Sequence, residues 1–205
     1  MYVPRSYRGD DAEIREVIRS HPFATLVSCG ESPLATHVPL ELVEGDPPVL
    51  FGHMARANPH WKALDPAREV LAIFKGPDAY VSPRWYAEPN VPTWNYVAVH
   101  AWGIPRLIEE RGDLIALVSA QVARFESGTG YTLESLPPDL LEKDLRGIVG
   151  LEIRVTRLEA SFKLSQNRDD ADHANVVRQL EGGSPQQREI AAWMLRRRSP
   201  AQGSG

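Results

Sequence analysis

Cysteine is almost absent from this sequence, since Cys29 is the only one among 205 residues. A single thiol cannot form an intramolecular disulfide, and it excludes a zinc site built from paired thiolates. Such sparing use of cysteine is typical of proteins in a reducing compartment. We therefore expect a cytoplasmic location.

Long apolar runs are also missing, and none approaches the roughly 20 residues that a membrane-spanning helix needs. The first thirty residues are rich in charged side chains, from Arg5 to Arg19, where a signal peptide would need an apolar segment. The sequence therefore predicts no contact with a membrane.

The sequence has no excess of positive charge, since 23 Lys and Arg residues stand against 27 Asp and Glu residues, a net charge of −4. Proteins that bind nucleic acids usually carry a basic patch. Arg196–Arg198 is the one basic cluster, and cations at the end of a helix also suit its dipole. DNA is a possible partner, but the net charge of the chain does not support it.

The remaining composition is that of an ordinary globular protein, with 42% hydrophobic and 24% charged residues. This excludes collagen, coiled coils and global disorder. A chain of this length buries a large core without disulfides. We expect one domain over residues 1–198, followed by a disordered tail over residues 199–205.

Strand-like segments dominate the first half of the chain. One helix precedes them, over residues 11–20, with Asp10 as its N-cap and Glu13 as the capping-box partner. The following segments are apolar and β-branched, and clusters of Gly, Pro, Asp and Ser separate most of them. The predicted strands cover residues 23–28, 34–43, 49–53, 70–75, 79–82 and 96–109, and a short helix covers residues 59–65.

The second half is predicted to be more helical. Its apolar residues recur at helical spacing in several segments, and one segment alternates as a half-buried strand does. The predicted helices cover residues 113–125, 138–145, 169–180 and 185–197, and the strand covers residues 150–162. Because most strands arrive at hairpin spacing, we expect an antiparallel barrel or sheet with flanking helices, an α+β fold that is mainly β.

A first candidate site lies between His53, where a strand ends, and the predicted helix that begins at Asn58 and Pro59. The N-terminus of a helix presents free N–H groups and suits an anion. Arg56 lies just before it, and a guanidinium binds phosphate in bidentate fashion. One such charge-assisted bond contributes roughly 1.5–3 kcal/mol. A solvated turn with a capped helix explains the same residues equally well.

A second candidate site is the proline- and aromatic-rich segment that runs from Gly76 to Tyr96. Aromatic side chains on a rigid loop form good walls for a planar ring, and Asn95 beside Trp94 offers a hydrogen bond to the ring edge. Aromatic residues of this kind also fill cores and subunit interfaces.

A third candidate site follows a predicted strand, where Lys163 and Gln166 lie in a polar segment that ends at Arg168. Helix capping and surface solvation explain such a segment too.

Other catalytic and metal-binding patterns are absent. His53 and His60 are seven residues apart, but a turn and a proline separate them, so they do not share a helix face. We expect no metal site. The sequence has no Walker loop and no Gly-x-Ser-x-Gly elbow, and Gly128-Thr129-Gly130 lacks the setting of a dinucleotide loop. No residue is assigned as a general acid or base.

Five motifs occur in an order that resembles one family over about residues 1–197. They are Met1-Tyr2-Val3-Pro4, His53-Met54-Ala55-Arg56-Ala57-Asn58-Pro59, Gly76-Pro77 to Tyr86, Val91-Pro92-Thr93-Trp94-Asn95-Tyr96 and Lys163-Leu164-Ser165-Gln166-Asn167. The chain resembles the PaiB-type FMN-binding negative transcriptional regulators. The resemblance implies an FMN-binding split barrel, a homodimer with two FMN sites at its interface, and a role in bacterial gene repression.

The resemblance and the residues agree on flavin. The phosphate is expected at Arg56 and the turn from His53 to Asn58, with Thr36 and His37 facing the same ligand from a neighbouring strand. Trp94 and Asn95 are expected to border the isoalloxazine from the partner subunit. Lys163 and Gln166 are expected at the flavin rim.

Three hypotheses follow for the function. The first is a dimeric FMN-binding regulator. The second is an FMN-dependent oxidoreductase of unknown substrate, in which the flavin would supply the hydride chemistry. The third is a dimeric interaction module without flavin.

Overall fold

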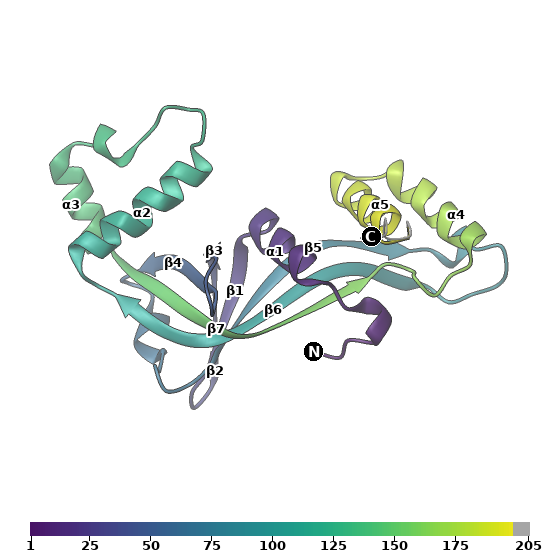
Figure 1. The fold of residues 1–205 in the computed structure, drawn as a ribbon, viewed down its shortest axis with the longest axis horizontal. Helices are drawn as coiled ribbons and strands as arrows, with labels where there is room; N and C mark the ends of the chain where they lie inside the picture. Colours follow the sequence, from purple (N-terminus) through teal and green to yellow (C-terminus); the bar gives the residue numbers. More distant parts are fainter. Residues whose placement is uncertain (199–205) are drawn as a thin grey trace. The chain divides into compact units, whose positions relative to one another are not determined.

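Residues 1–198 are described by a computed structural model, drawn in Figure 1. Seven strands form one sheet in the order β2-β1-β5-β6-β7-β4-β3. The strands are β1 (Phe23–Cys29), β2 (Pro33–Pro39), β3 (Glu41–Val43), β4 (Val49–Ala55), β5 (Val70–Val81), β6 (Thr93–Ile108) and β7 (Ile148–Lys163). The expected tail, residues 199–205, lies outside the described residues.

The helices do not alternate with single strands: one precedes β1, two lie between β6 and β7, and two follow β7. They are α1 (Asp11–Ser20), α2 (Arg111–Phe125), α3 (Pro138–Arg146), α4 (Asp170–Glu181) and α5 (Pro185–Arg198). Four short 3-10 helices are η1 (Arg5–Tyr7), η2 (Pro59–Ala63), η3 (Pro83–Trp85) and η4 (Leu133–Ser135). The expected antiparallel α+β fold is confirmed, and no helix of the described part is long and apolar enough to cross a membrane.

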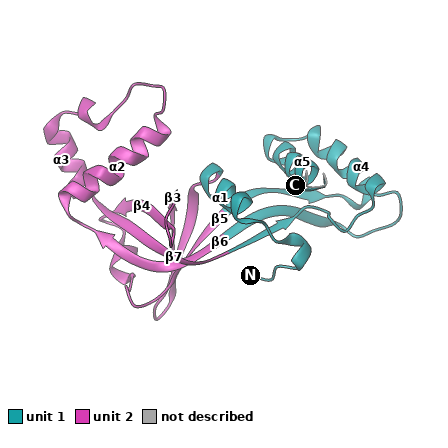
Figure 2. Ribbon diagram, in the orientation of Figure 1, with its two compact units in different colours: residues 1–20, 75–99, 159–205 teal, residues 21–74, 100–158 magenta. Residues whose placement is uncertain are grey.

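The contacts of the chain divide it into two compact units, coloured in Figure 2. Among the described residues, unit 1 comprises residues 1–20, 75–99 and 159–198, and unit 2 comprises residues 21–74 and 100–158. The strands β5, β6 and β7 each contribute residues to both units. The expectation of one domain stays a prediction.

The start of α1 follows from a capping box, as the sequence predicts. The backbone N–H of Glu13 donates to Asp10 Oδ1 at 2.8 Å, and the N–H of Asp10 donates to Glu13 Oε2 at 2.9 Å. Two of the free N–H groups at the helix N-terminus are thereby satisfied. Ile14, Val17 and Ile18 form the buried face of the helix.

The predicted hairpin of β1 and β2 is confirmed, with Phe23 opposite Pro39 and Cys29 opposite Pro33. The single strand expected over residues 34–43 was wrong, because it breaks at Leu40. Leu40 donates its N–H to Pro22 O at 2.8 Å, and the residues beyond it pair with β4 instead. Pro39 has no N–H to continue the ladder, which favours the break.

The turn expected over Gly76-Pro77-Asp78 was also wrong, since β5 runs through it without interruption. A Cβ at Gly76 would lie 3.1 Å from the carbonyl oxygen of Val97, so the absence of a side chain permits a close approach. An ion pair between Lys75 and Asp78 bridges the same stretch of strand. The expected helix over residues 59–65 is the shorter 3-10 helix η2.

The core of unit 2 includes an apolar cluster beneath α2. Ile108, Leu114, Leu117 and Leu145 are its buried members, and Phe51 on β4 packs against them. In unit 1, α4 and α5 lie side by side (Figure 1), and the rings of Phe162 and Trp193 are 5.0 Å apart. Burial of such side chains contributes the main stabilising free energy of both units.

Gly52 on β4 is required by a close backbone approach. A Cβ there would lie 2.5 Å from Pro39 O, whereas a Cβ at Gly112 in the first turn of α2 would meet nothing within 4 Å. We expect Gly52→Ala to lower the free energy of unfolding by about 1–3 kcal/mol, through overpacking. Gly112→Ala is the control and is expected to be neutral or slightly stabilising. Equal stabilities in urea unfolding would contradict this requirement.

Candidate functional site

A buried hydrogen-bond network in unit 2 is centred on His60, which is 2% exposed. Its Nδ1 is hydrogen-bonded to Thr36 Oγ1 at 2.8 Å, and its Nε2 to Ser28 Oγ at 2.9 Å. Asn58 Nδ2 donates to Thr36 Oγ1 at 3.1 Å, and Asn58 Oδ1 accepts the N–H of His60 at 3.0 Å. The network therefore ties β1, β2 and the turn before η2 together.

Burial lowers the pKa of the His60 imidazole below its ordinary value of 6.5. A buried imidazole without a carboxylate partner is held neutral, because its charged form loses hydration on burial. Both ring nitrogens have hydroxyl partners, so the neutral ring is fully hydrogen-bonded. His60 is thus a structural residue that fixes the predicted flavin segment.

Two hydrogen bonds hold the backbone of Arg56 in place. Its N–H donates to Gly147 O at 2.8 Å, and its carbonyl accepts from the indole N–H of Trp61 at 2.9 Å. The guanidinium pairs with Glu109 at 2.9 Å and lies 5.7 Å from the centre of the Trp61 ring. A rigid backbone with a partly exposed cation is a suitable base for an anion site.

Arg56 opens onto a pocket of about 400 Å³ in unit 2. The other residues that line it are Glu109, Arg111, Leu114, Glu142, Leu145 and Arg146. Three guanidinium groups stand against two carboxylates, which leaves one positive charge. Arg111 and Glu142 form an ion pair, with Arg111 Nε donating at 2.8 Å. The donor set fits a phosphate group. Phosphate oxygens would replace the carboxylate oxygens as acceptors for the guanidinium groups.

The structure does not support the expected contribution of a helix N-terminus to the anion site. The helix η2 has only 5 residues, and Asn58 caps it by accepting the N–H of His60. That N–H is therefore occupied, and the side chain of Asn58 points to Thr36 rather than to an open space. The charge of Arg56 and its neighbours, more than the helix dipole, makes the pocket suitable for an anion.

The two predicted histidines of unit 2 have different partners. His53 Nδ1 is hydrogen-bonded at 2.7 Å to Gln121 Oε1 on α2. His37 is exposed on β2, where its Nδ1 is hydrogen-bonded to Thr25 Oγ1 at 3.0 Å and its ring stacks on Phe23. The structure thus brings Thr36 and Asn58 into direct contact, while His53 and His37 each have separate partners.

In unit 1, the predicted pair Trp94 and Asn95 divides into an exposed and a buried residue. Trp94 is 53% exposed and meets the Tyr80 ring edge-on, with centroids 5.9 Å apart. Asn95 is fully buried, and its amide donates to Ser165 Oγ at 3.0 Å. Ser165 has a positive φ of 60°, so this bond holds a left-handed turn after β7. Trp94 offers an open aromatic surface, whereas Asn95 shapes the turn.

Lys163 is the last residue of β7, and Gln166 lies on the turn that follows it. Lys163 donates to the carbonyl of Trp94 at 2.9 Å and also to Thr93 Oγ1. Burial lowers the pKa of the Lys163 ammonium, and the nearby Arg168 lowers it further. Gln166 accepts the N–H of Leu164 at 2.8 Å. These contacts join Lys163 to Trp94, whereas the amide of Gln166 is bonded to the backbone of Leu164 and Phe162.

The arginines at the end of α5 are engaged within their own unit. The ion pairs join Arg196 to Glu16, Arg197 to Glu13 and Arg198 to Asp170. This basic cluster, which was the one DNA candidate in the sequence, therefore stabilises the packing of α5. Within residues 1–198, no group of three or more His, Cys, Asp or Glu side chains is arranged to hold a metal ion.

The sequence alone missed Arg111 and Arg146 beside Arg56, and Gln121 beside His53. They come from segments about 50 to 90 residues further along the chain. Their spacing carries no motif. Only the fold brings them to β4.

The antiparallel sheet with its flanking helices defines a protein of the split-barrel fold. Two solved structures share the fold. One is the flavocytochrome Anf3 from Azotobacter vinelandii, with a TM-score of 0.64 and 17% identity, covering 84% of this chain and 78% of that one. The other is the FAD and heme binding protein from Mycobacterium smegmatis, with a TM-score of 0.60 and 18% identity, covering 87% and 81%.

The chain belongs to the family described as "Putative FMN-binding domain", whose model matches residues 1–157. A curated relative is the protease synthase and sporulation protein PAI 2 of Bacillus subtilis. It is 36% identical over 200 residues, which cover 95% of this chain and 96% of the relative. The resemblance to the PaiB-type family is confirmed, and FMN is the cofactor of that family.

The buried His60 makes stability depend on pH. Below about pH 6.5 the unfolded chain binds a proton that folded His60 resists, so the free energy of unfolding falls as the pH falls. The limit is about 1.4 kcal/mol per pH unit for one histidine. His173, whose pKa burial also lowers, adds to the effect. We expect His60→Gln to give a shallower slope than the wild type in urea unfolding between pH 7 and pH 5, and a wild-type slope would contradict it.

Proposed function

We propose that this chain is a homodimeric FMN-binding protein that acts as a negative regulator of transcription, as PaiB-type proteins do. The observation that carries the proposal is the arginine-lined pocket around Arg56, within the part of the chain that matches the FMN-binding family. The cytoplasmic location expected from the lone Cys29 belongs to the same proposal.

The flavin would be held mainly by two sets of residues. Arg56, with Arg111 and Arg146, would bind the phosphate, while the network of Thr36, Asn58 and His60 fixes the backbone beside it. In a dimer, the exposed ring of Trp94 of the partner subunit would border the isoalloxazine, with the partner subunit's Lys163 and the partner subunit's Gln166 at its rim. When bound, FMN supplies redox chemistry at its ring system.

The homodimer is supported by exposed apolar side chains in both units. Val91 is 68% exposed and Trp94 is 53% exposed in unit 1, and Phe23 is 67% exposed in unit 2. Aromatic side chains such as those of Trp94 and Phe23 are enriched at protein interfaces. In a dimer, the partner subunit would bring its own Trp94 to the flavin.

Repression through direct DNA contact gains no support from charge. The net charge is −4, and the three arginines of α5 form ion pairs within unit 1. We therefore propose that the flavin-loaded dimer acts on transcription through a partner that reads the DNA. Salt-sensitive, sequence-specific binding of an operator by the purified protein would contradict this part.

The phosphate assignment is tested by Arg56→Ala. We expect FMN affinity to fall at least tenfold, or about 1.4 kcal/mol, because one charge-assisted partner of the phosphate is lost. The control is Arg68→Ala, which removes an exposed arginine paired with Asp65, also in unit 2 but outside the pocket. Affinity is measured by fluorescence titration of FMN, and unchanged affinity of Arg56→Ala would remove the assignment.

The flavin-binding homodimer is tested by loading the purified protein with FMN and removing the unbound fraction. We expect about one FMN per chain by absorption, and a molar mass by light scattering of twice the 22.8 kDa of the chain. Rapid bleaching by NADH or NADPH, with turnover, would replace the regulator by an FMN-dependent oxidoreductase. A dimer that retains no flavin would leave an interaction module.

A further inference from the structure

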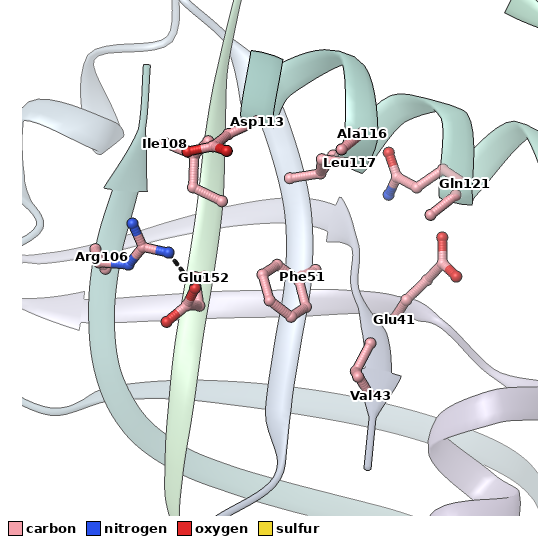
Figure 3. A pocket seen from close by; sticks show the side chains of 11 residues that line it. Glu41, Val43, Phe51, Arg106, Ile108, Asp113, Ala116, Leu117, Gln121 and Glu152 are labelled. Carbon is pink, nitrogen blue, oxygen red and sulfur yellow. Dashed lines mark hydrogen bonds and ion pairs between the residues drawn. The ribbon is translucent and has the colours of Figure 1, made fainter. Parts of the chain in front are cut away.

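A second pocket of unit 2, separate from the one at Arg56, has a volume of about 350 Å³ (Figure 3). It lies between β3 and α2, with Phe51 of β4 as an aromatic wall. The apolar side chains that line it are Val43, Phe51, Ile108, Ala116, Leu117 and Ala120. Its polar members are Glu41, Arg106, Asp113, Gln121 and Glu152. A largely apolar cavity with a few polar groups is typical of small-molecule sites.

Two buried polar atoms of this pocket have no hydrogen-bond partner: Glu41 Oε1 and Gln121 Nε2. The other atoms of both groups are engaged, since Gln121 Oε1 is bonded to His53 and Glu41 Oε2 accepts from Arg124 at 3.3 Å. Gln121 is only 8% exposed. A buried polar atom left unpaired costs about 1–3 kcal/mol, so natural proteins rarely keep one without a purpose.

The two unpartnered atoms indicate which polar groups a ligand of this pocket must present. The side chains of Glu41 and Gln121 reach toward one another from β3 and α2 (Figure 3). Gln121 Nε2 can only donate a hydrogen bond and Glu41 Oε1 can only accept one. A ligand that presents a carbonyl oxygen beside an N–H satisfies both. A lactam, in which the two groups are adjacent on one ring, has this arrangement.

The charge of the pocket excludes anions. Glu41, Asp113 and Glu152 supply three carboxylates, and Arg106 is paired with Glu152. A phosphate or carboxylate ligand would meet like charge here, in contrast to the pocket at Arg56. The apolar walls favour a flat, uncharged ring, for which Phe51 offers a stacking surface.

We propose that this pocket is a second ligand site, which binds a small neutral heterocycle through its lactam edge. The N–H of the ligand donates to Glu41 Oε1, and its carbonyl oxygen accepts from Gln121 Nε2. Phe51 and Leu117 contact the ring. This site is distinct from the phosphate pocket, and it does not depend on FMN being bound.

The experiment uses 2-pyridone, which has a single lactam edge, and N-methyl-2-pyridone, which has the same ring and carbonyl but no N–H. Binding to the full chain is measured by saturation-transfer NMR and by titration. We expect 2-pyridone to bind at millimolar concentration or below, and N-methyl-2-pyridone to bind at least tenfold more weakly. Equal binding of the two probes, or no binding of 2-pyridone, would overturn the proposal.

Two variants of α2 locate the site. Ala120 and Ala123 are both exposed on α2, but only Ala120 lines the pocket. We expect Ala120→Met to weaken 2-pyridone binding at least tenfold and Ala123→Met to leave it unchanged, with similar melting temperatures for both. Full affinity in Ala120→Met would overturn the proposal.

Competition with FMN separates this site from the flavin site, because the isoalloxazine ring also carries an N–H beside a carbonyl. The titration of 2-pyridone is repeated at saturating FMN, and we expect the same affinity. Complete displacement by FMN would show that the pocket belongs to the flavin site, which would overturn a second site without weakening the proposed function.

Discussion

The organisation of unit 2 depends on the hydrogen bonds of the buried His60 imidazole. Hydrogen bonds from both of its nitrogens join the β1–β2 hairpin to the segment after β4, and Asn58 completes the network. A single imidazole, bonded on both sides and kept neutral by burial, therefore sets where the chain turns after β4. Because Arg56 lies at the beginning of that turn, the same network determines where its positive charge is presented.

Much of the fold follows from local rules that the sequence displays directly. The capping box at Asp10 and Glu13 fixes the start of α1, apolar and β-branched residues identify β1, and alternation of apolar residues identifies β7. Where local rules and packing disagree, packing prevails. Gly76-Pro77-Asp78 has the composition of a turn, yet β5 continues through it, and Gly76 lies where a side chain would closely approach Val97.

The candidate site could be predicted only in part, and the reason is physical. Arg56 and Trp94 were visible because they lie in short motifs with an evident chemistry. The arginines and Gln121 that complete the two pockets of unit 2 come from α2 and α3, and nothing local marks them. Asn95 shows the converse, since its motif is clear but its amide is used to hold the turn at Ser165.

Three of the strands belong to both units, and this has a consequence for how the protein is made. Strand β4 pairs with β7, so that Val49 lies opposite Arg154, more than one hundred residues later. Unit 1 also needs residues beyond 158. On the ribosome, neither unit can complete its part of the sheet until most of the chain has emerged. Non-local pairing of this kind slows folding, so β4 gains its permanent neighbour only after β7 has been made.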